Sequence, residues 1–383
     1  MSVTAANGFR AAGVTAGLKA SGRPDVALVV NDGPGCSAAA VFTSNRCVAH
    51  PVIWSRQAMS AGTARAVVLN SGGANCYTGA AGFQLVHATA ETVAAGLGIG
   101  PIEVQVCSTG LIGRLHDGAA MLGGAASAVA ALASDGGQAA AEAMMTTDTV
   151  PKQAVVRGAG FTVGGMAKGA GMLAPQLATM LVVLTTDADV DAAACDRALR
   201  SATRTTFDRI DSDGCMSTND QVLLMASGAS GATPSTDQLA AAVYEVCLAL
   251  TRQLVADAEG ADHEIAVQVR GAASEADAVE VARSIARSNL VKAAIFGRDP
   301  NWGRILASVG TTSAAFDPLN LDVSLNGVAV CRASAPAEPV DGVDLTSRDV
   351  HVLVDLHSGG AEATVWTNDL THAYVHENSA YST

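Results

Sequence analysis

One threonine, Thr179, stands directly before Met180–Leu184, an unbroken apolar run that is typical of a strand buried on both faces. A threonine hydroxyl is a poor nucleophile unless a base takes its proton. Cutting the peptide bond between Ala178 and Thr179 would supply that base, because the new α-amino group, with a pKa of about 7.7–8, accepts a proton near neutral pH. Thr179 could make the cut itself if its oxygen attacked the Ala178 carbonyl and water then resolved the ester. The alternative is that Thr179 simply begins a strand, which suits a β-branched residue.

Flexible residues lead up to this threonine in the segment "GGMAKGAGMLAPQLAT". Gly169 and Gly171 allow the chain to turn sharply there. Pro175 favours extended geometry at the residue before it, Ala174. These residues permit self-cleavage without demanding it.

An acyl-transfer site also needs hydrogen-bond donors for the oxyanion that develops on the attacked carbonyl. The segment "CSTGLIG" ends a predicted strand with Thr109, whose hydroxyl can donate, and Gly110, whose N–H can approach a ligand closely. Both residues therefore are candidates for an oxyanion hole, and the alternative is a glycine turn at a strand end. The segment "NSGGAN", Asn70–Asn75, is a similar glycine turn to which the residues alone assign no role.

The sequence gives weaker support to a serine-hydrolase site, a nucleotide site or a metal site. The sequence contains neither a GxSxG nucleophile motif nor a GxxxxGK[ST] phosphate loop. The segment "GAGMLA", Gly169–Ala174, matches GxGxxA, but it precedes a predicted strand instead of opening a helix, so the context for a dinucleotide is wrong. His372 and His376 are spaced to share one helical face, yet no third metal-ligand cluster accompanies them, and a solvated C-terminal segment fits better than a metal site.

The charge composition of the chain indicates which class of molecule it binds. The 383 residues carry a net charge of −13 with only 23 Lys and Arg, which argues against nucleic acid or an anionic membrane and favours a small polar metabolite. The eight cysteines are scattered without a CxxC pair, as expected of reduced thiols. We see no secretory signal and no apolar stretch of transmembrane length, so we expect a cytoplasmic protein.

Short apolar strands alternate with alanine-rich helices along the chain. Strands are predicted at 25–30, 38–43, 64–70, 103–110 and after Thr179, a hairpin at 158–160, and helices at 81–98, within 116–148, from Asp191, at 237–260 and at 274–297. Several strands lie too close together for helical crossovers. The pattern therefore predicts a layered α/β architecture with at least partly antiparallel sheets, and the length allows two lobes.

Eight segments in order resemble ornithine acetyltransferase, also called the bifunctional glutamate N-acetyltransferase family of arginine biosynthesis. They are "NSGGAN", "CSTGLIG", "MTTDTVPK", "GGMAKGAGMLAPQLATMLVVLTTDA", "TFDRIDSDGCMSTND", "DAEG", "LVKAAIFGRDPNWGR" and "HENSAYST". Each is weak alone, but the ordered set is specific and covers nearly the whole chain.

The resemblance implies an αββα-type sandwich with mixed or antiparallel sheets in two lobes. It also implies cleavage after Ala178 into an α chain, residues 1–178, and a β chain, residues 179–383, associated as α2β2. Thr179 would be the nucleophile, and Thr109 with Gly110 the oxyanion hole. The substrate contacts that it implies are Thr146, Lys168, Thr179, Glu259, Asn378 and Thr383.

The reaction that the resemblance implies is ping-pong acetyl transfer from N2-acetylornithine to glutamate through an acetyl-Thr179 ester, without a metal or organic cofactor. Acetyl-CoA stays open as a second acetyl donor. The nearest alternative is a self-processing amidohydrolase or aminopeptidase that uses the same N-terminal nucleophile with water as acceptor. A nucleotide-binding α/β module that uses "GAGMLA" or "NSGGAN" as a phosphate loop is the alternative from another class.

Overall fold

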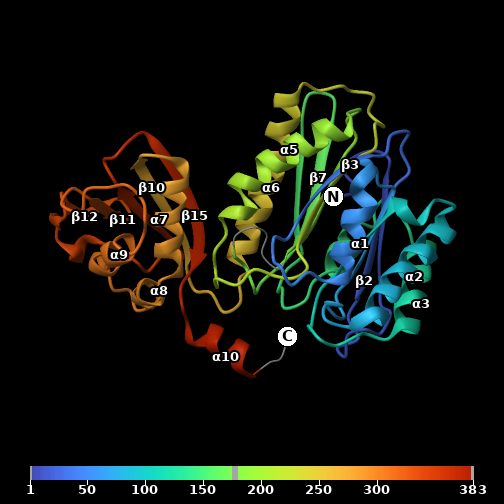
Figure 1. The fold of residues 1–383 in the computed structure, drawn as a ribbon, viewed down its shortest axis with the longest axis horizontal. Coiled ribbons are helices and arrows are strands. Elements are labelled where there is room, and N and C mark those ends of the chain that lie inside the picture. The colour runs from blue at the N-terminus through green and yellow to red at the C-terminus, as the bar shows by residue number, and fades with distance from the viewer. Residues whose placement is uncertain (1, 175–179, 381–383) are drawn as a thin grey trace. The chain divides into compact units, whose positions relative to one another are not determined.

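The computed structural model describes residues 2–174 and 180–380, which divide into two compact units. Unit 1 contains the described residues up to Asp208 together with Cys215–Asp257. Unit 2 contains Arg209–Gly214 and the described residues from Ala258 onward. Figure 1 shows the helices and strands of both units.

The described residues of unit 1 form two β-sheets. One is four-stranded in the order β1 (Phe9–Val14), β2 (Val26–Asn31), β4 (Ala66–Asn70) and β5 (Val104–Ser108). The other is five-stranded in the order β3 (Ser37–Phe42), β9 (Gln221–Ala226), β8 (Leu181–Thr186), β7 (Thr162–Lys168) and β6 (Lys152–Arg157). The pairs β4–β5 and β8–β9 are parallel and the remaining neighbours antiparallel, so the sheets are mixed, as expected.

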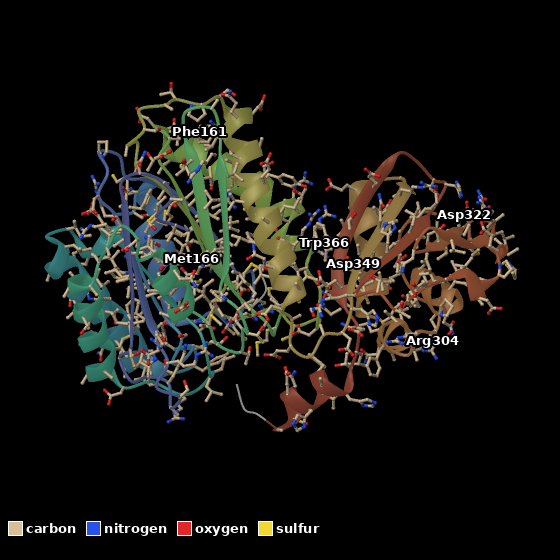
Figure 2. The ribbon with its side chains drawn as sticks, turned by 180° about the vertical axis from the view of Figure 1, so that it is seen from behind. Phe161, Met166, Arg304, Asp322, Asp349 and Trp366 are labelled. Carbon is tan, nitrogen blue, oxygen red and sulfur yellow. The ribbon has the colours of Figure 1, made fainter. Side chains whose placement is uncertain are left out.

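Helices cover the outer faces of the two sheets. The helices of unit 1 are α1 (His50–Ala58), α2 (Gly79–Leu97), α3 (Gly118–Ala130), α4 (Gly137–Ala143), α5 (Ala192–Thr205) and α6 (Thr236–Ala256). Helices α1–α3 pack on the four-stranded sheet, and α5 and α6 on the five-stranded sheet (Figure 1). The inner faces meet in a core that includes Val29, Leu69, Met166 and Val183 (Met166 is labelled in Figure 2). This confirms the αββα-type sandwich.

Burial on both faces explains the apolar strands. Every residue of β2, β4, β8 and β9 is buried, because one face of each sheet meets the other sheet and the second face meets helices. An αββα arrangement therefore requires continuous apolar runs, and the run after Thr179 becomes β8.

Within the described residues, α6 is the one helix long and apolar enough to cross a membrane by length and composition. Half of its most apolar window is buried inside the protein. Leu239, Val246, Leu250 and Leu254 are among its buried residues, and the helix packs on β6, β7 and α5. These contacts are those of a core helix of the sandwich.

Unit 2 is built on one sheet. In the described residues it has six strands, in the order β13 (Ala335–Pro336), β12 (Val328–Arg332), β11 (Asp322–Leu325), β14 (Asp349–Asp355), β10 (Glu264–Ala272) and β15 (Ala361–Asn368). Its helices are α7 (Glu275–Arg287), α8 (Asn289–Phe296), α9 (Trp302–Val309) and α10 (His372–Ala380). Along β10 buried and half-exposed residues alternate, because α7 covers a single face of this sheet.

The prediction of one continuous helix over residues 274–297 is wrong, because the segment forms two helices, α7 and α8. At Ser288 the backbone has φ −72° and ψ 105°, which ends α7. The Ser288 hydroxyl then accepts the N–H of Val291 at 3.4 Å and caps the start of α8. A serine between two apolar stretches is thus a helix boundary here.

Candidate active site

The predicted oxyanion turn lies at the carboxyl end of β5. Thr109 is buried, and its N–H donates to the Asn70 carbonyl at 3.0 Å, while its carbonyl accepts the N–H of Gly73 at 3.0 Å. Gly110 has φ +130°, and a Cβ there would lie 2.9 Å from Gly73 N. Because a side chain would collide with the backbone, only glycine fits at position 110.

These contacts also give the segment Asn70–Asn75 a structural role. The N–H groups of Ser71, Gly73 and Ala74 donate to main-chain carbonyls, and that of Gly72 lies 3.4 Å from Asn70 Oδ1. A phosphate loop requires N–H groups that point at the ligand, so this segment braces the Thr109–Gly110 turn instead. The N–H of Gly169 in "GAGMLA" is likewise used, by Asp148 Oδ1 at 2.7 Å.

Lys168, the last residue of β7, is buried with about 1% of its surface exposed. Its Nζ donates to Thr109 Oγ1 at 3.1 Å. A hydroxyl that accepts a hydrogen bond still has its own proton to donate. Lys168 is therefore a buried lysine and not a solvated one, and it leaves the Thr109 hydroxyl able to donate to another acceptor.

A buried carboxylate, Asp148, binds Thr146 and Lys152 and feels the charge of Lys168. Asp148 Oδ1 accepts Lys152 Nζ at 2.6 Å, and Oδ2 accepts the N–H of Thr146 at 2.9 Å. Burial opposes ionisation of this carboxyl, but the charges of Lys168 and Lys152 prevail and hold its pKa at about 2. Lys152 also pairs with Asp257 at 2.5 Å. Sequence reasoning assigned no role to Asp148, Lys152 or Asp257.

Asp220 binds the residue that follows Thr179. It is fully buried, and its Oδ1 accepts the N–H of Met180 at 3.0 Å. Burial raises the pKa of Asp220 well above its usual range, against the opposing effects of the Met180 N–H, Lys168 and Ser217. Sequence reasoning assigned no role to Asp220 either, although the motif "STND" contains it.

Strand register gathers these groups at one end of the sandwich. Lys168 on β7 lies opposite Leu181 on β8, which lies opposite Gln221 on β9. Asn219 then joins the two sheets, because its Nδ2 donates to the carbonyls of Ala74 at 2.6 Å and Ser108 at 2.9 Å. The turn with Thr109 and the start of β8 therefore belong to one buried polar cluster.

The predicted nucleophile and scissile bond, Thr179 and Ala178, lie outside the described residues, as does Thr383. Met180 is the nearest described residue on the C-terminal side of the predicted cut. The structure therefore describes Thr109, Lys168 and Asp220, and it describes Met180, the residue covalently bonded to Thr179.

Two further predicted substrate residues contact each other in unit 2. Asn378 on α10 donates from Nδ2 to Glu259 Oε2 at 3.1 Å. The Thr371 hydroxyl donates to the carbonyl of Gly260 at 2.6 Å, and a Cβ on Gly260 would lie 2.3 Å from Tyr374 N. Glycine after Glu259 thus lets the start of α10 pack closely on this loop. The segment up to Ala380 is an anchored helix and not a frayed tail.

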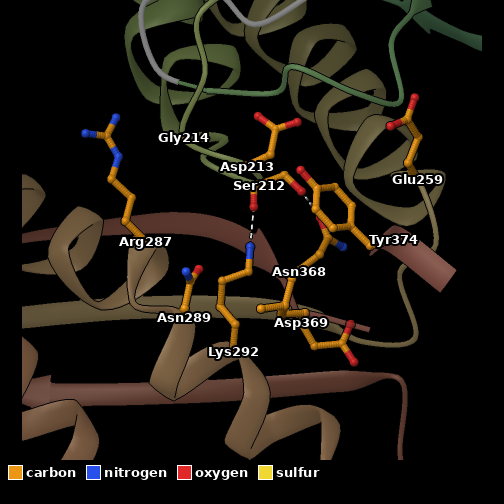
Figure 3. Close-up of a pocket in the computed structure, with 11 residues that line it drawn as sticks. Ser212, Asp213, Gly214, Glu259, Arg287, Asn289, Lys292, Asn368, Asp369 and Tyr374 are labelled. Carbon is orange, nitrogen blue, oxygen red and sulfur yellow. Dashed lines mark hydrogen bonds between the residues drawn. The ribbon is translucent and has the colours of Figure 1, made fainter. Parts of the chain in front are cut away.

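Glu259 lines a solvent-accessible pocket in unit 2 (Figure 3). The cations Arg287 and Lys292 and the carboxylates Asp213 and Asp369 share this lining. Lys292 Nζ donates to the Ser212 carbonyl, the bond drawn as a dashed line in Figure 3. Burial lowers the pKa of Lys292, and the nearby aspartates counter that effect. Both signs of charge in one pocket suit a small ligand that itself carries both.

The histidine pair does not form a metal site with other described residues. Among residues 2–174 and 180–380, no group of three or more His, Cys, Asp or Glu side chains is placed to hold a metal ion. His372 and His376 lie exposed on α10, and the His372 ring packs edge-on to Phe296 with centroids 5.4 Å apart. His372 therefore has a packing contact.

A family model and two relatives each match nearly all or all of the chain. The ArgJ family profile matches residues 10–383. The arginine biosynthesis bifunctional protein ArgJ of Streptomyces avermitilis is 62% identical over 382 residues, and that of Thermobifida fusca 61% over 383, each match covering 100% of both chains. A crystal structure of ornithine acetyltransferase complexed with ornithine, from Mycobacterium tuberculosis, is 56% identical, with 45% of this chain and 94% of that chain covered and a TM-score of 0.45.

Proposed function

The chain belongs to the ArgJ family, and we propose that it transfers an acetyl group from N2-acetylornithine to glutamate through an acetyl ester on Thr179. The observation that carries this proposal is the buried cluster that joins Thr109 and Lys168 to Asp220 and, through it, to Met180. It unites a donor for an oxyanion, a cation and the neighbour of the nucleophile. An acyl-transfer site requires a nucleophile and hydrogen-bond donors for the oxyanion.

Self-cleavage between Ala178 and Thr179 would create the nucleophile. The α-amino group of Thr179 would then take the hydroxyl proton as the oxygen attacks the acetyl carbonyl of N2-acetylornithine. The Thr109 hydroxyl and the Gly110 N–H would donate to the oxyanion, and ornithine would leave with the proton on its amino nitrogen. The unprotonated amine of glutamate would next attack the ester and release N-acetylglutamate.

Strand pairing supports an enzyme that stays together after the cut. Strand β8, on the C-terminal side of the predicted cut, is hydrogen-bonded over six register pairs to β7, which lies on its N-terminal side. On its other edge β8 pairs with β9. The α chain, residues 1–178, and the β chain, residues 179–383, would thus share one sheet. Association of two such pairs as α2β2 and a cytoplasmic location remain predictions.

Charge and hydrogen-bonding capacity suggest how the substrates would be held. Lys168 is a buried cation suited to a carboxylate, and Thr146 offers a hydroxyl to the acyl amide. Glu259 with Asn378 would take an amino group, beside a pocket that presents both signs of charge. The final residue, Thr383, completes the set that the family resemblance implies. A zwitterionic amino acid matches these groups better than a nucleotide does.

The identity of the acetyl acceptor, glutamate or water, distinguishes this enzyme from a self-processing amidohydrolase. We would incubate the protein with acetyl-labelled N2-acetylornithine, with and without glutamate, and follow labelled products. The proposal predicts labelled N-acetylglutamate that depends on glutamate. Labelled acetate in equal amount with and without glutamate would support the hydrolase. A parallel assay with acetyl-CoA shows whether that donor also serves.

A further inference from the structure

We propose that Asp220 accepts the Thr179 hydroxyl proton during self-cleavage, a step in which the α-amino group cannot serve. This inference rests on the self-cleavage described above. Before the cut, Thr179 N is an amide nitrogen, whose lone pair is delocalised into the carbonyl group. A base other than the α-amine is therefore required for the first reaction of the chain, although not for acetyl transfer.

The position of Asp220 follows from its contacts with Met180. Asp220 Oδ1 accepts the Met180 N–H at 3.0 Å, and the N–H of the next residue, Gln221, donates to the Met180 carbonyl at 3.3 Å. Met180 N is covalently bonded to the carbonyl carbon of Thr179. The carboxyl of Asp220 thus lies against the amide nitrogen of Met180, the atom bonded to Thr179 in the chain.

The second carboxyl oxygen of Asp220, Oδ2, has no hydrogen-bond partner among the described residues. This oxygen is buried. A buried carboxylate oxygen without such a partner is uncommon, because its desolvation is not compensated. Among the described residues, no donor occupies Oδ2, so this oxygen can accept a proton.

The charges around Asp220 suit a proton acceptor. Lys168 on β7 favours the ionised carboxyl, whereas burial and the carboxylate of Asp208 disfavour it. A carboxyl whose surroundings disfavour the ionised form is a stronger base than one in water. The Ser217 hydroxyl and the Met180 N–H also act on Asp220, and both favour ionisation.

In this reaction one proton moves from Thr179 Oγ to Asp220 and then to the Thr179 nitrogen. Thr179 Oγ adds to the Ala178 carbonyl carbon while its proton moves to Asp220 Oδ2. The bond between Ala178 C and Thr179 N then breaks, and Asp220 returns the proton to that nitrogen, which gives the α-amine and an ester on Oγ. Water hydrolyses the ester and leaves the Ala178 carboxylate and the free Thr179 hydroxyl. From then on the α-amine is the base.

The test measures self-cleavage of the full chain made by cell-free translation with labelled methionine, followed by a chase on denaturing gels. General-base catalysis contributes about 10²–10⁴-fold, so Asp220→Asn should slow cleavage by about 100-fold or more. Asp220→Glu keeps a carboxyl and should restore part of the rate. The wild-type rate should rise with pH as Asp220 ionises, and Asp220→Asn should lose that rise.

A matched control is Asp187→Asn. Asp187 is a buried carboxylate of the same unit, but both its oxygens accept main-chain N–H groups, from Asn7 at 3.0 Å and Thr162 at 2.7 Å. Slowing by Asp187→Asn equal to that by Asp220→Asn would mean general destabilisation and would overturn the proposal. Cleavage of Asp220→Asn at the wild-type rate would overturn it as well.

Acetyl transfer per cleaved chain gives the second readout. Asp220 is the base for self-cleavage and not for acetyl transfer. The Asp220→Asn substitution should therefore lower the rate of self-cleavage at least tenfold more than it lowers the rate of acetyl transfer, measured on the chains that have been cleaved. Equal losses in both would assign Asp220 a structural role instead. A wild-type chain that never cleaves would refute the proposed function itself, which separates that failure from the failure of this inference.

Discussion

Lys168 should act on acetyl transfer through the hydroxyl of Thr109, and this can be measured. Lys168 Nζ donates to Thr109 Oγ1 at 3.1 Å. Loss of one oxyanion donor lowers kcat by about 10²–10³, so we expect Thr109→Val to lower it by about 100-fold or more. A hydrogen bond to a charged group contributes about 1.5–3 kcal/mol, so Lys168→Met should lower kcat by roughly 10- to 100-fold.

The double variant decides whether the two residues act together. If Lys168 serves to orient the Thr109 hydroxyl, removing the lysine should matter little once the hydroxyl is gone. We expect the Thr109→Val, Lys168→Met protein to be within about threefold of Thr109→Val alone, a coupling in the range found for residues in contact. Fully additive losses would refute the reasoning.

The assay is single-turnover formation of the acetyl ester at saturating labelled N2-acetylornithine, expressed per cleaved chain, so that a contact between Lys168 and a substrate carboxylate changes affinity and not the measured rate. Lys19→Met is the matched control. Lys19 is a half-buried neighbouring cation whose pKa burial lowers to about 8, and its Nζ donates to the carbonyls of Pro24 and Met145 and not to Thr109. It should leave the coupling between Lys168 and Thr109 intact. Urea unfolding of each variant measures any loss of stability.

Three further predictions concern stability and substrate affinity. Because the pKa of Asp148 is depressed in the folded state from 3.8 to about 2, the stability it adds is present above pH 3.8 and is lost as the pH falls through about 2. Urea titrations over this range should show a loss of roughly 2 kcal/mol in the free energy of unfolding, since a tenfold change in proton affinity corresponds to about 1.4 kcal/mol, and Asp148→Asn should abolish it. Gly110→Ala, which brings a Cβ within 2.9 Å of Gly73 N at φ +130°, should lower the free energy of unfolding by about 1–3 kcal/mol; an unchanged urea midpoint would contradict the strain. Glu259→Gln keeps an acceptor for Asn378 but removes the charge, so KM should rise about tenfold for N2-acetylornithine, as expected for roughly 1.4 kcal/mol, with little change for glutamate; equal effects in steady-state assays would argue against pairing with an amino group.

The sequence predicted the elements whose burial pattern is visible locally. β4 and β8 are continuous apolar runs, and α6 has apolar residues at helical spacing, so the sequence pattern alone predicts each of them. β1, with the sequence "FRAAGV", was missed because alanine and glycine give no clear alternation. The break between α7 and α8 was missed because apolar periodicity continues across Ser288.

The site was only partly predictable, because its connections are long-range. Thr109 and Lys168 were selected separately, and the hydrogen bond between them joins residues 59 positions apart. Asp148 and Asp220 carry no local signal, since an acidic residue in a polar loop is usually solvated. Their chemistry comes from burial and from partners on other strands, which a sequence pattern does not reveal. The ordered motifs indicated the family, whereas the proton-handling groups needed the fold.

Denaturing mass spectrometry of the purified, active protein after brief exposure to N2-acetylornithine tests the central claim most directly. The account predicts two fragments divided between Ala178 and Thr179, with one added acetyl group on the peptide that begins at Thr179. A fully active chain of a single intact mass, or an acetyl group on any other residue, would contradict it.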